Sequence, residues 1–155
     1  MQHKNISIFD IEGFSLGKKF RLLGKLYQSV LTKKLKHIGI EKYFSVLVLL
    51  DNIDAQCSQK LIADVLLTNK TTMVSILDDL VENGFIKRIK NPNDRREHWI
   101  QLTNKAKKYL PEIKKAINET NNLIIEGICL ADANRIEEYL EIMYRNVLGE
   151  INNTL

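Results

Sequence analysis

Apolar residues recur every three or four positions in three long stretches of the chain, at about residues 15–38, 104–128 and 132–150. This spacing places them on one face of an α-helix, so the pattern predicts three long amphipathic helices. Pro111 lies inside the second stretch. Because proline lacks an N–H and clashes with the preceding turn, Pro111 should kink this helix or mark its true beginning.

The centre of the chain has shorter periodic stretches. Residues 41–53, 58–66 and 69–83 each have the apolar spacing of a short helix. Side chains that accept a hydrogen bond from the first helical turn favour a helix start. The expected N-caps are Ser58 for the second helix and Thr68 or Asn69 for the third.

A β-hairpin should follow the third short helix. Gly84 comes directly after that helix, where glycine commonly ends a helix in a left-handed conformation. Residues 85–90 and 97–102 then predict two short strands, and the loop between them contains Asn-Pro-Asn-Asp at positions 91–94.

The order helix, tight turn, helix, hairpin is that of a winged helix-turn-helix unit. In such a unit the second helix fits the major groove of DNA. Its outward positions would carry small hydrogen-bonding groups and one cation, which suit base edges and phosphates. They are Asn69, Lys70, Thr72 and Ser75. The alternative is that these are merely exposed polar residues of a helix, and the hairpin that follows favours the DNA-binding interpretation.

Composition places the chain among ordinary globular proteins. It has 155 residues, 45% of them hydrophobic and 27% charged, which suits one domain with a substantial core. No apolar run is long enough for a membrane span, and the N-terminus has no signal-peptide pattern, so we expect a cytoplasmic protein. In that compartment Cys57 and Cys129 should be free, buried or half-buried thiols.

The positive charge of the chain is concentrated around the predicted hairpin. Residues 87–108 contain eight Lys or Arg and two acids, whereas the rest of the chain contains 15 bases and 17 acids. A focused basic patch suggests a polyanionic partner, nucleic acid first. A solvated basic surface without a partner remains the alternative on charge alone.

Residues 77–110, LDDLVENGFIKRIKNPNDRREHWIQLTNKAKKYL, resemble the MarR family of bacterial transcriptional regulators. The family pattern has an Asp and a Leu in the second helix, a Gly before the first strand, Asp-x-Arg in the wing, and apolar-x-Leu-Thr before a long helix. This chain supplies Asp78, Leu80, Gly84, Asp94, Arg96, Ile100, Leu102 and Thr103.

The resemblance implies a mainly α protein with a small β-hairpin wing, forming a single MarR-like domain over residues 1–155. A winged helix-turn-helix lobe would span about residues 41–103, and dimerisation helices about 10–38 and 104–151. The protein would bind a pseudo-palindromic operator as a homodimer. The wing arginine would enter a narrow minor groove, whose negative potential favours a cation. The expected DNA contacts are Asn69, Lys70, Thr72, Ser75, Arg88, Lys90, Asp94, Arg95 and Arg96.

Two positions depart from the family pattern. Family members often have Arg after the helix Asp, where this chain has Asp79. An acid near phosphates weakens binding unless it pairs with a base of the wing or strand. Leu67 lies in the helix-turn-helix turn, where a small residue is common. The turn should therefore be wider, or Leu67 should pack inward.

No pattern in the sequence indicates catalysis, a metal or a cofactor. There is no Gly-rich phosphate loop, and His3, His37 and His98 are dispersed, so we expect a non-enzyme without zinc. The resemblance implies a small aromatic ligand between the dimer helices and the DNA-binding lobe. Its candidate lining is Tyr27, His37, Tyr43 and Phe44, although aromatic residues are mainly core or interface material, and that alternative is favoured for each.

These observations predict a sequence-specific DNA-binding regulator, a homodimeric repressor that a small ligand releases. Two other functions remain open from the sequence. A non-specific architectural DNA-binding protein would use the same basic wing. An interaction adaptor could keep the fold without DNA binding, and Asp79 is the residue that supports this alternative.

Overall fold

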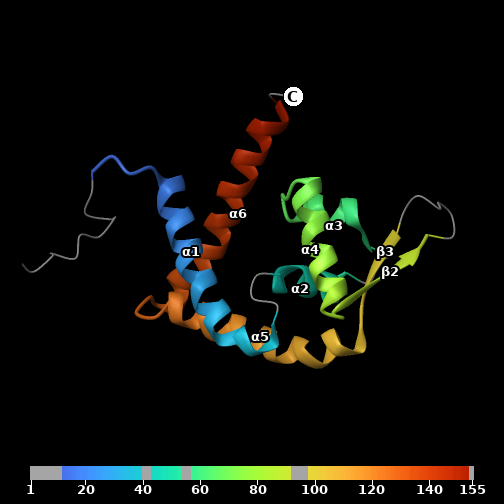
Figure 1. Cartoon of the computed structure of the whole chain (residues 1–155). Helices are drawn as coiled ribbons and strands as arrows, with labels where there is room; N and C mark the ends of the chain where they lie inside the picture. Colours follow the sequence, from blue (N-terminus) through green and yellow to red (C-terminus); the bar gives the residue numbers. More distant parts are fainter. Residues whose placement is uncertain (1–11, 40–42, 54–56, 92–97, 154–155) are drawn as a thin grey trace, which may run out of the picture. The chain divides into compact units, whose positions relative to one another are not determined.

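The computed structural model describes residues 12–39, 43–53, 57–91 and 98–153 (Figure 1). It divides into two compact units, residues up to Thr120 and residues from Asn121 onward. The elements are α1 (Leu16–Leu35), the short 3-10 helix η1 (Lys36–Ile38), α2 (Phe44–Asn52), β1 (Cys57–Ser58), α3 (Gln59–Val65), α4 (Lys70–Glu82), β2 (Ile86–Lys90), β3 (His98–Leu102), α5 (Asn104–Ile124) and α6 (Leu130–Asn153).

The predicted capping residues begin the helices of the helix-turn-helix. The Ser58 hydroxyl accepts a hydrogen bond from the Leu61 N–H at 3.2 Å, and the Asn69 side-chain oxygen accepts one from the Thr72 N–H at 2.8 Å. Asn69, rather than Thr68, is therefore the cap of α4. Each bond satisfies an N–H that the first turn of a helix leaves without a partner.

The wing belongs to a three-stranded antiparallel sheet of order β1-β3-β2. In β2 and β3 the residues pair from Ile86 with Leu102 to Lys90 with His98, as the predicted hairpin requires. The first strand, β1, was not predicted. Its two residues pair with Ile100 and Trp99. A strand of two residues is too short to show the alternation of apolar and polar residues by which strands are predicted.

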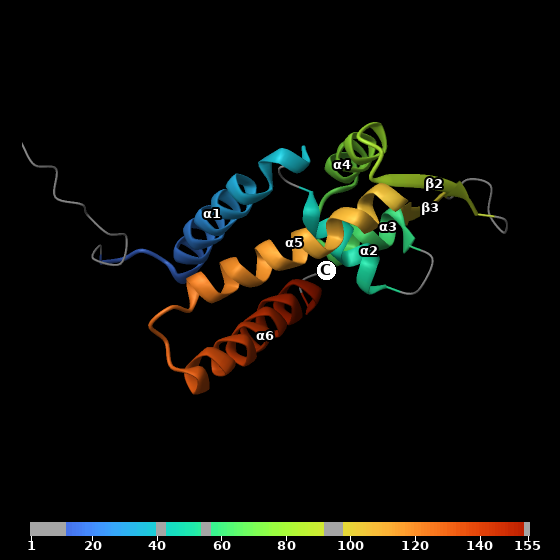
Figure 2. The ribbon, with the colours of Figure 1, turned by 90° about the horizontal axis from the view of Figure 1, so that it is seen from below.

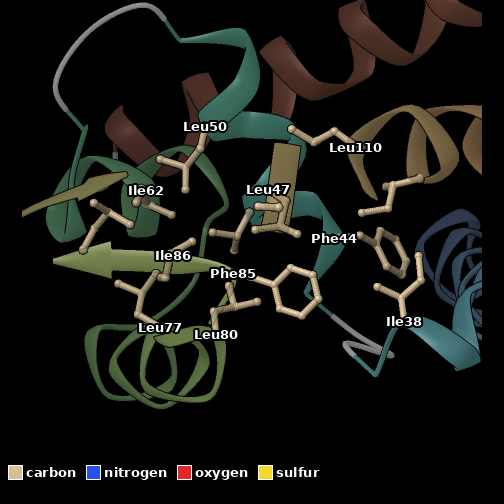
Figure 3. Close-up of a cluster of buried hydrophobic side chains, with 14 of the residues drawn as sticks. Ile38, Phe44, Leu47, Leu50, Ile62, Leu77, Leu80, Phe85, Ile86 and Leu110 are labelled. Atoms are coloured by element: carbon tan, nitrogen blue, oxygen red, sulfur yellow. The ribbon is translucent and has the colours of Figure 1, made fainter. Parts of the chain in front are cut away.

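The core of the first unit joins the helix-turn-helix, the sheet and α5 (Figure 3). Side chains fully removed from solvent each contribute about 1.5–3 kcal/mol of stability. Lys105 covers one side of this core, with its ammonium 4.4 Å from the centre of the Phe85 ring. The most deeply buried side chains include Leu47, Ile62, Met73, Leu77, Leu80, Phe85, Ile86 and Ile113.

Within the first unit, α1 runs beside α5 (Figure 2). Lys34 pairs with Glu119 at 2.6 Å, and His37 pairs with Glu112 at 2.7 Å. As the residue number rises along the first helix, its partner's number falls along the second, so the two helices are antiparallel. Beside the Lys34 ammonium, the pKa of Glu119 lies below its ordinary value.

Two expected helix boundaries were wrong, and one of the two alternatives for Pro111 is excluded. The second long helix ends at Ile124 instead of residue 128, and Gly127 follows it with a left-handed φ of 84°. The helix expected over 41–53 begins at Phe44 in the described residues. Pro111 lies inside α5, which begins at Asn104, so the proline does not mark the beginning of that helix.

The two cysteines differ in their surroundings. Cys57 is buried in β1, and burial raises the pKa of its thiol. Cys129 is exposed, so the expectation that both thiols are buried or half-buried was wrong for this residue. It lies just before α6, where its backbone carbonyl accepts the Ala133 N–H at 2.9 Å and its thiol donates to Asp132 at 3.2 Å.

The second unit consists mainly of α6. Large apolar side chains are exposed along this helix, among them Leu140, Met143 and Val147 of the predicted apolar face and also Tyr139, Ile142, Tyr144 and Ile151. None of the described helices combines the length and the apolar character that a membrane crossing requires.

Candidate nucleic-acid interface

The second helix of the helix-turn-helix, α4, buries one face and exposes the other. Met73, Leu77 and Leu80 are fully buried on the core side. Because successive residues turn by about 100° around a helix, Thr71 and Ser75 face away from this buried side. Both are exposed, and they lie in the N-terminal half of the helix.

All four DNA-contact residues predicted at the start of this helix are exposed: Asn69, Lys70, Thr72 and Ser75. The Asn69 side-chain oxygen already accepts the Thr72 N–H, which leaves its amide NH₂ as the group free to donate outward. Thr71 was missed by the sequence prediction. Its position four residues before Ser75 was the signal, since residues at that spacing share a helix face.

The two strand residues predicted to contact DNA differ in how they are held. Arg88 forms an ion pair with Asp78 of α4, with Nη1 and Oδ1 2.7 Å apart. Lys90, two residues further along β2, is exposed opposite His98. Part of the Arg88 charge is thus compensated within the protein, whereas Lys90 presents its charge to solvent.

The three wing-tip residues Asp94, Arg95 and Arg96 lie outside the described residues. Their predicted roles in the minor groove therefore stay predictions.

A concave region of about 580 Å³ lies between the first and second helices of the helix-turn-helix and the wing strands. Lys60 of α3, Lys70 of α4 and Arg88 of β2 contribute bases to its lining, and Asp64 contributes an acid. Concave basic surfaces concentrate negatively charged ligands, because the low-dielectric walls focus the electric field. This region joins the exposed start of α4 to the wing.

Asp79 lies four residues after Ser75 on α4, but its side chain is half-buried rather than exposed. Tyr43 is the residue before α2, and burial, hydrogen bonding to Asp79 and the negative charge of Asp79 raise the pKa of its hydroxyl. The adjacent Asp78 is the carboxylate that pairs with a strand base.

Leu67 occupies the tight turn between α3 and α4 with a left-handed φ of 47° and a side chain 68% exposed. The N–H groups of Leu67 and Thr68 donate to the carbonyls of Asp64 and Ala63, at 3.2 and 2.9 Å. This pair of bonds is the Schellman pattern that closes a helix C-terminus. The alternative that Leu67 packs inward was wrong, because its side chain is exposed.

The four residues predicted to line a ligand site lie in different environments. Phe44 is buried in the core, and Tyr43 is half-buried against it. His37 is exposed and pairs with Glu112, and Tyr27 is half-buried, which raises the pKa of its hydroxyl. The basic concave region described above has none of these four in its lining.

Within the described part of the chain, no group of three or more His, Cys, Asp or Glu side chains comes together in a way that could hold a metal ion.

A helix-turn-helix with a capped, outward-facing second helix and a β-hairpin beside it defines a winged helix-turn-helix protein. Residues 41–98 match the sequence profile of the MarR family. A MarR transcriptional regulator from Methanosarcina mazei Go1 is 30% identical to the chain, and the alignment covers 86% of this chain and 96% of that one, with a TM-score of 0.81. The chain belongs to the MarR family.

Two further solved structures share the fold at lower identity. A MarR protein from Peptoclostridium difficile is 16% identical over 99% of this chain and 100% of its own, with a TM-score of 0.85. A MarR-family transcriptional regulator from Listeria monocytogenes, solved in complex with a 26mer DNA, is 19% identical over 88% of this chain and 91% of its own, with a TM-score of 0.80. At these identities the likeness shows the fold alone.

Proposed function

We propose that this protein is a sequence-specific DNA-binding transcriptional regulator, acting as a homodimeric repressor on a pseudo-palindromic operator. The observation that carries the proposal is the outward face of α4. This face presents Thr71 and Ser75 to solvent, Lys70 is exposed at the beginning of the helix, and the opposite face is buried. Hydroxyl and ammonium groups on a protruding helix are suited to base edges and phosphates of a major groove.

The charge of the neighbouring elements supports the same partner. Lys60 and Lys90 are exposed beside the recognition helix, as α4 is called from here on, and the whole stretch of residues 87–108 is strongly basic. Such a surface attracts a polyanion and makes its binding fall with salt concentration. The DNA bound in the Listeria monocytogenes relative is consistent with this partner.

The positions of the acids weigh against the adaptor alternative. Asp79 was the residue that favoured loss of DNA binding, because an acid on the outward face would repel phosphates. Its side chain is half-buried instead. Repulsion between Asp79 and DNA phosphates, which was the reason for the adaptor alternative, is therefore reduced.

Footprinting on the DNA upstream of the gene tests the proposal. A regulator of this kind should protect two half-sites about one helical turn apart and should hold its affinity against excess random duplex. Uniform protection that random duplex abolishes would identify an architectural DNA-binding protein. Absence of protection at low salt would support the adaptor.

The wing arginines provide a sharper test at single-residue level. By the family pattern, Arg96 enters the minor groove with Asp94 holding its guanidinium, and Arg95 contacts a phosphate or solvent. Arg96→Ala should weaken operator binding at least about tenfold at fixed salt, from a contact of roughly 1–3 kcal/mol. Asp94→Ala should resemble a milder Arg96→Ala.

Arg95→Ala is the matched control for the wing. It should weaken operator and random DNA about equally and lower the salt slope by about one unit, because it removes one phosphate contact. All three variants are titrated with operator DNA at two salt concentrations. If Arg96→Ala binds like the parent while Arg95→Ala fails, the wing register is displaced by one residue.

Release by a small aromatic ligand is the last part of the proposal. It rests on the family resemblance, with Tyr27, His37, Tyr43 and Phe44 as the candidate lining. Release is measured by titrating aromatic carboxylic acids and phenols into the protein–operator complex. A ligand of this class should dissociate the complex, and the Tyr27→Ala variant should need more of it.

A further inference from the structure

The C-terminal end of the recognition helix is attached to the beginning of α5. The Lys105 ammonium donates a hydrogen bond to the backbone carbonyl of Asn83, the residue after the helix, with Nζ and O 2.8 Å apart. The Thr103 hydroxyl lies 2.7 Å from the carbonyl oxygen of Gly84 and 3.1 Å from that of Phe85. The Thr103 N–H also donates to the Phe85 carbonyl, at 3.0 Å. Two residues at the beginning of α5 therefore hold three consecutive carbonyls.

The Lys105 ammonium makes a second contact at the same helix end. It lies over the Phe85 ring, 4.4 Å from the ring centre. Phe85 is fully buried in the core (Figure 3), so this ring is a fixed support. Both the face of an aromatic ring and the negative C-terminal end of a helix attract a cation. The charge of Lys105 is thus directed at the end of the recognition helix.

The opposite end of this helix carries the groups that face DNA in the proposed function. Thr71 and Ser75 are exposed in its N-terminal half. At 1.5 Å per residue, Thr71 lies about 18 Å along the axis from Asn83. A tilt of about 3° about the C-terminal end therefore displaces Thr71 by about 1 Å. This displacement exceeds the tolerance of about 0.5 Å within which a binding constellation functions.

We propose that Lys105 is a positioning residue for DNA recognition, which fixes the tilt of the recognition helix through its hydrogen bond to the Asn83 carbonyl. The inference rests on the proposed function and adds a residue of α5 to it. Base edges demand closer placement than phosphates that long, flexible lysines contact, so loss of the bond should reduce preference for the operator. The salt dependence of binding should stay nearly unchanged, because no phosphate contact is lost.

Three substitutions isolate the contact. Lys105→Met removes the ammonium but keeps a long, unbranched side chain beside the Phe85 ring, so packing changes little. Lys105→Arg is the conservative variant, because a guanidinium also donates hydrogen bonds and stacks on aromatic rings. Lys108→Met is the matched control, since Lys108 is exposed on the same helix and its substitution removes the same charge. Thermal unfolding without DNA verifies that each variant is folded.

The effect on recognition is measured by titrating operator and random duplex into each protein at two salt concentrations. Lys105→Met should lower the ratio of operator affinity to random-duplex affinity about three- to tenfold, the effect of losing one hydrogen bond. Its salt slope should match that of the parent. Lys105→Arg should restore most of the ratio, and Lys108→Met should leave the ratio unchanged.

The attachment of the helix end is measured without DNA, by amide hydrogen exchange followed by NMR. The N–H groups of Gly84 and Phe85 close the helix end by donating to carbonyls of its last turn, each at 2.9 Å. Without the Lys105 contact these bonds should open more often. Exchange at both amides should therefore be faster in Lys105→Met than in the parent and in Lys108→Met. Equal exchange in the three proteins would overturn the inference.

The binding titrations can overturn the positioning role in three ways. If Lys105→Met weakens operator and random duplex equally and lowers the salt slope by about one unit, Lys105 contacts a phosphate directly. If Lys105→Met lowers the unfolding temperature but keeps the preference for the operator, the contact only stabilises the fold. The role is also excluded if Lys108→Met, or Lys105→Arg, loses as much of the preference as Lys105→Met.

Failure of this inference differs from failure of the proposed function. A parent protein that prefers no operator over random duplex contradicts the proposed function. A parent that prefers its operator, with a Lys105→Met variant that keeps the same preference, overturns only the positioning role.

Discussion

At the scale of single residues, two helix C-termini use the same hydrogen bonds with different residues. Gly84 ends α4 with φ 70°, and the N–H groups of Gly84 and Phe85 donate to Val81 and Leu80. Leu67 ends α3 with φ 47° and the same bond pattern. The left-handed conformation costs an L-residue with a side chain roughly 1–2 kcal/mol, a cost that glycine avoids.

Leu67→Gly should therefore stabilise the protein. The side chain is 68% exposed, so its removal loses little buried apolar surface. After the extra conformational entropy that glycine gives the unfolded chain, the expected gain is about 0.5–1 kcal/mol, or about 2–4 °C in Tm. Thermal and urea unfolding of the variant beside the parent measure it.

Leu67→Ala is the control for this prediction. Alanine also removes the exposed side chain, but its Cβ keeps the strain of the left-handed backbone. Its stability should stay at or below that of the parent. Equal gains for the glycine and alanine variants would show that the side chain, rather than the backbone conformation, is the destabilising feature.

At the scale of elements, the start of the recognition helix combines a structural and a proposed DNA-contacting role in one residue. The Asn69 side chain caps the helix through the Thr72 N–H at 2.8 Å and is exposed on the proposed DNA surface. Substitutions that keep the cap but change the charge separate the two roles, because Asp caps a helix about as well as Asn.

Asn69→Ala should lower stability by about 1 kcal/mol, since the first turn loses its acceptor. Asn69→Asp should keep the stability of the parent, because a carboxylate caps the helix and its charge is favourable at a helix N-terminus. The aspartate should nevertheless weaken DNA binding, through repulsion from phosphates and loss of the amide donor. Urea unfolding of both variants measures the effect on stability, and operator titration measures the effect on DNA binding. An Asn69→Asp protein that binds operator as tightly as the parent would show that Asn69 does not contact DNA.

At the scale of the whole molecule, the apolar surface of α6 predicts a dimer. Leu140, Met143 and Val147 are exposed at steps of three and four along this helix. Each such side chain gains about 1.5–3 kcal/mol when fully buried, so a second copy of the chain is a favourable cover. Sedimentation at micromolar concentration should find a dimer, and a well-folded monomer would contradict the prediction.

Paired substitutions on α6 test whether this apolar face forms the dimer interface. Ile136→Asp with Leu140→Asp should give monomers or unfolded protein, because the charges would be buried without partners. Asn134→Asp with Asn146→Asp adds the same charges at exposed polar positions of the helix and should leave the dimer intact. A dimer that survives the first pair would place the interface on other elements.

The sequence by itself determined the features that depend on neighbours in the chain. Helical spacing located the long helices, and the side chains of Ser58 and Asn69 marked helix starts that the structure confirms. Gly84 and the alternating residues after it identified the wing, since a turn and a hairpin register are local properties. The family pattern in residues 77–110 was readable for the same reason.

Only the tertiary structure decided which distant groups meet. The pairing of β1 with β3 and the Asp78–Arg88 ion pair join residues that are not neighbours in the sequence. No local pattern distinguishes Asp78 from Asp79, although Asp78 pairs with the wing and Asp79 is half-buried. The left-handed Leu67 was likewise hidden, because packing of α3 against α4 and the two bonds closing the turn impose a conformation that leucine disfavours by itself.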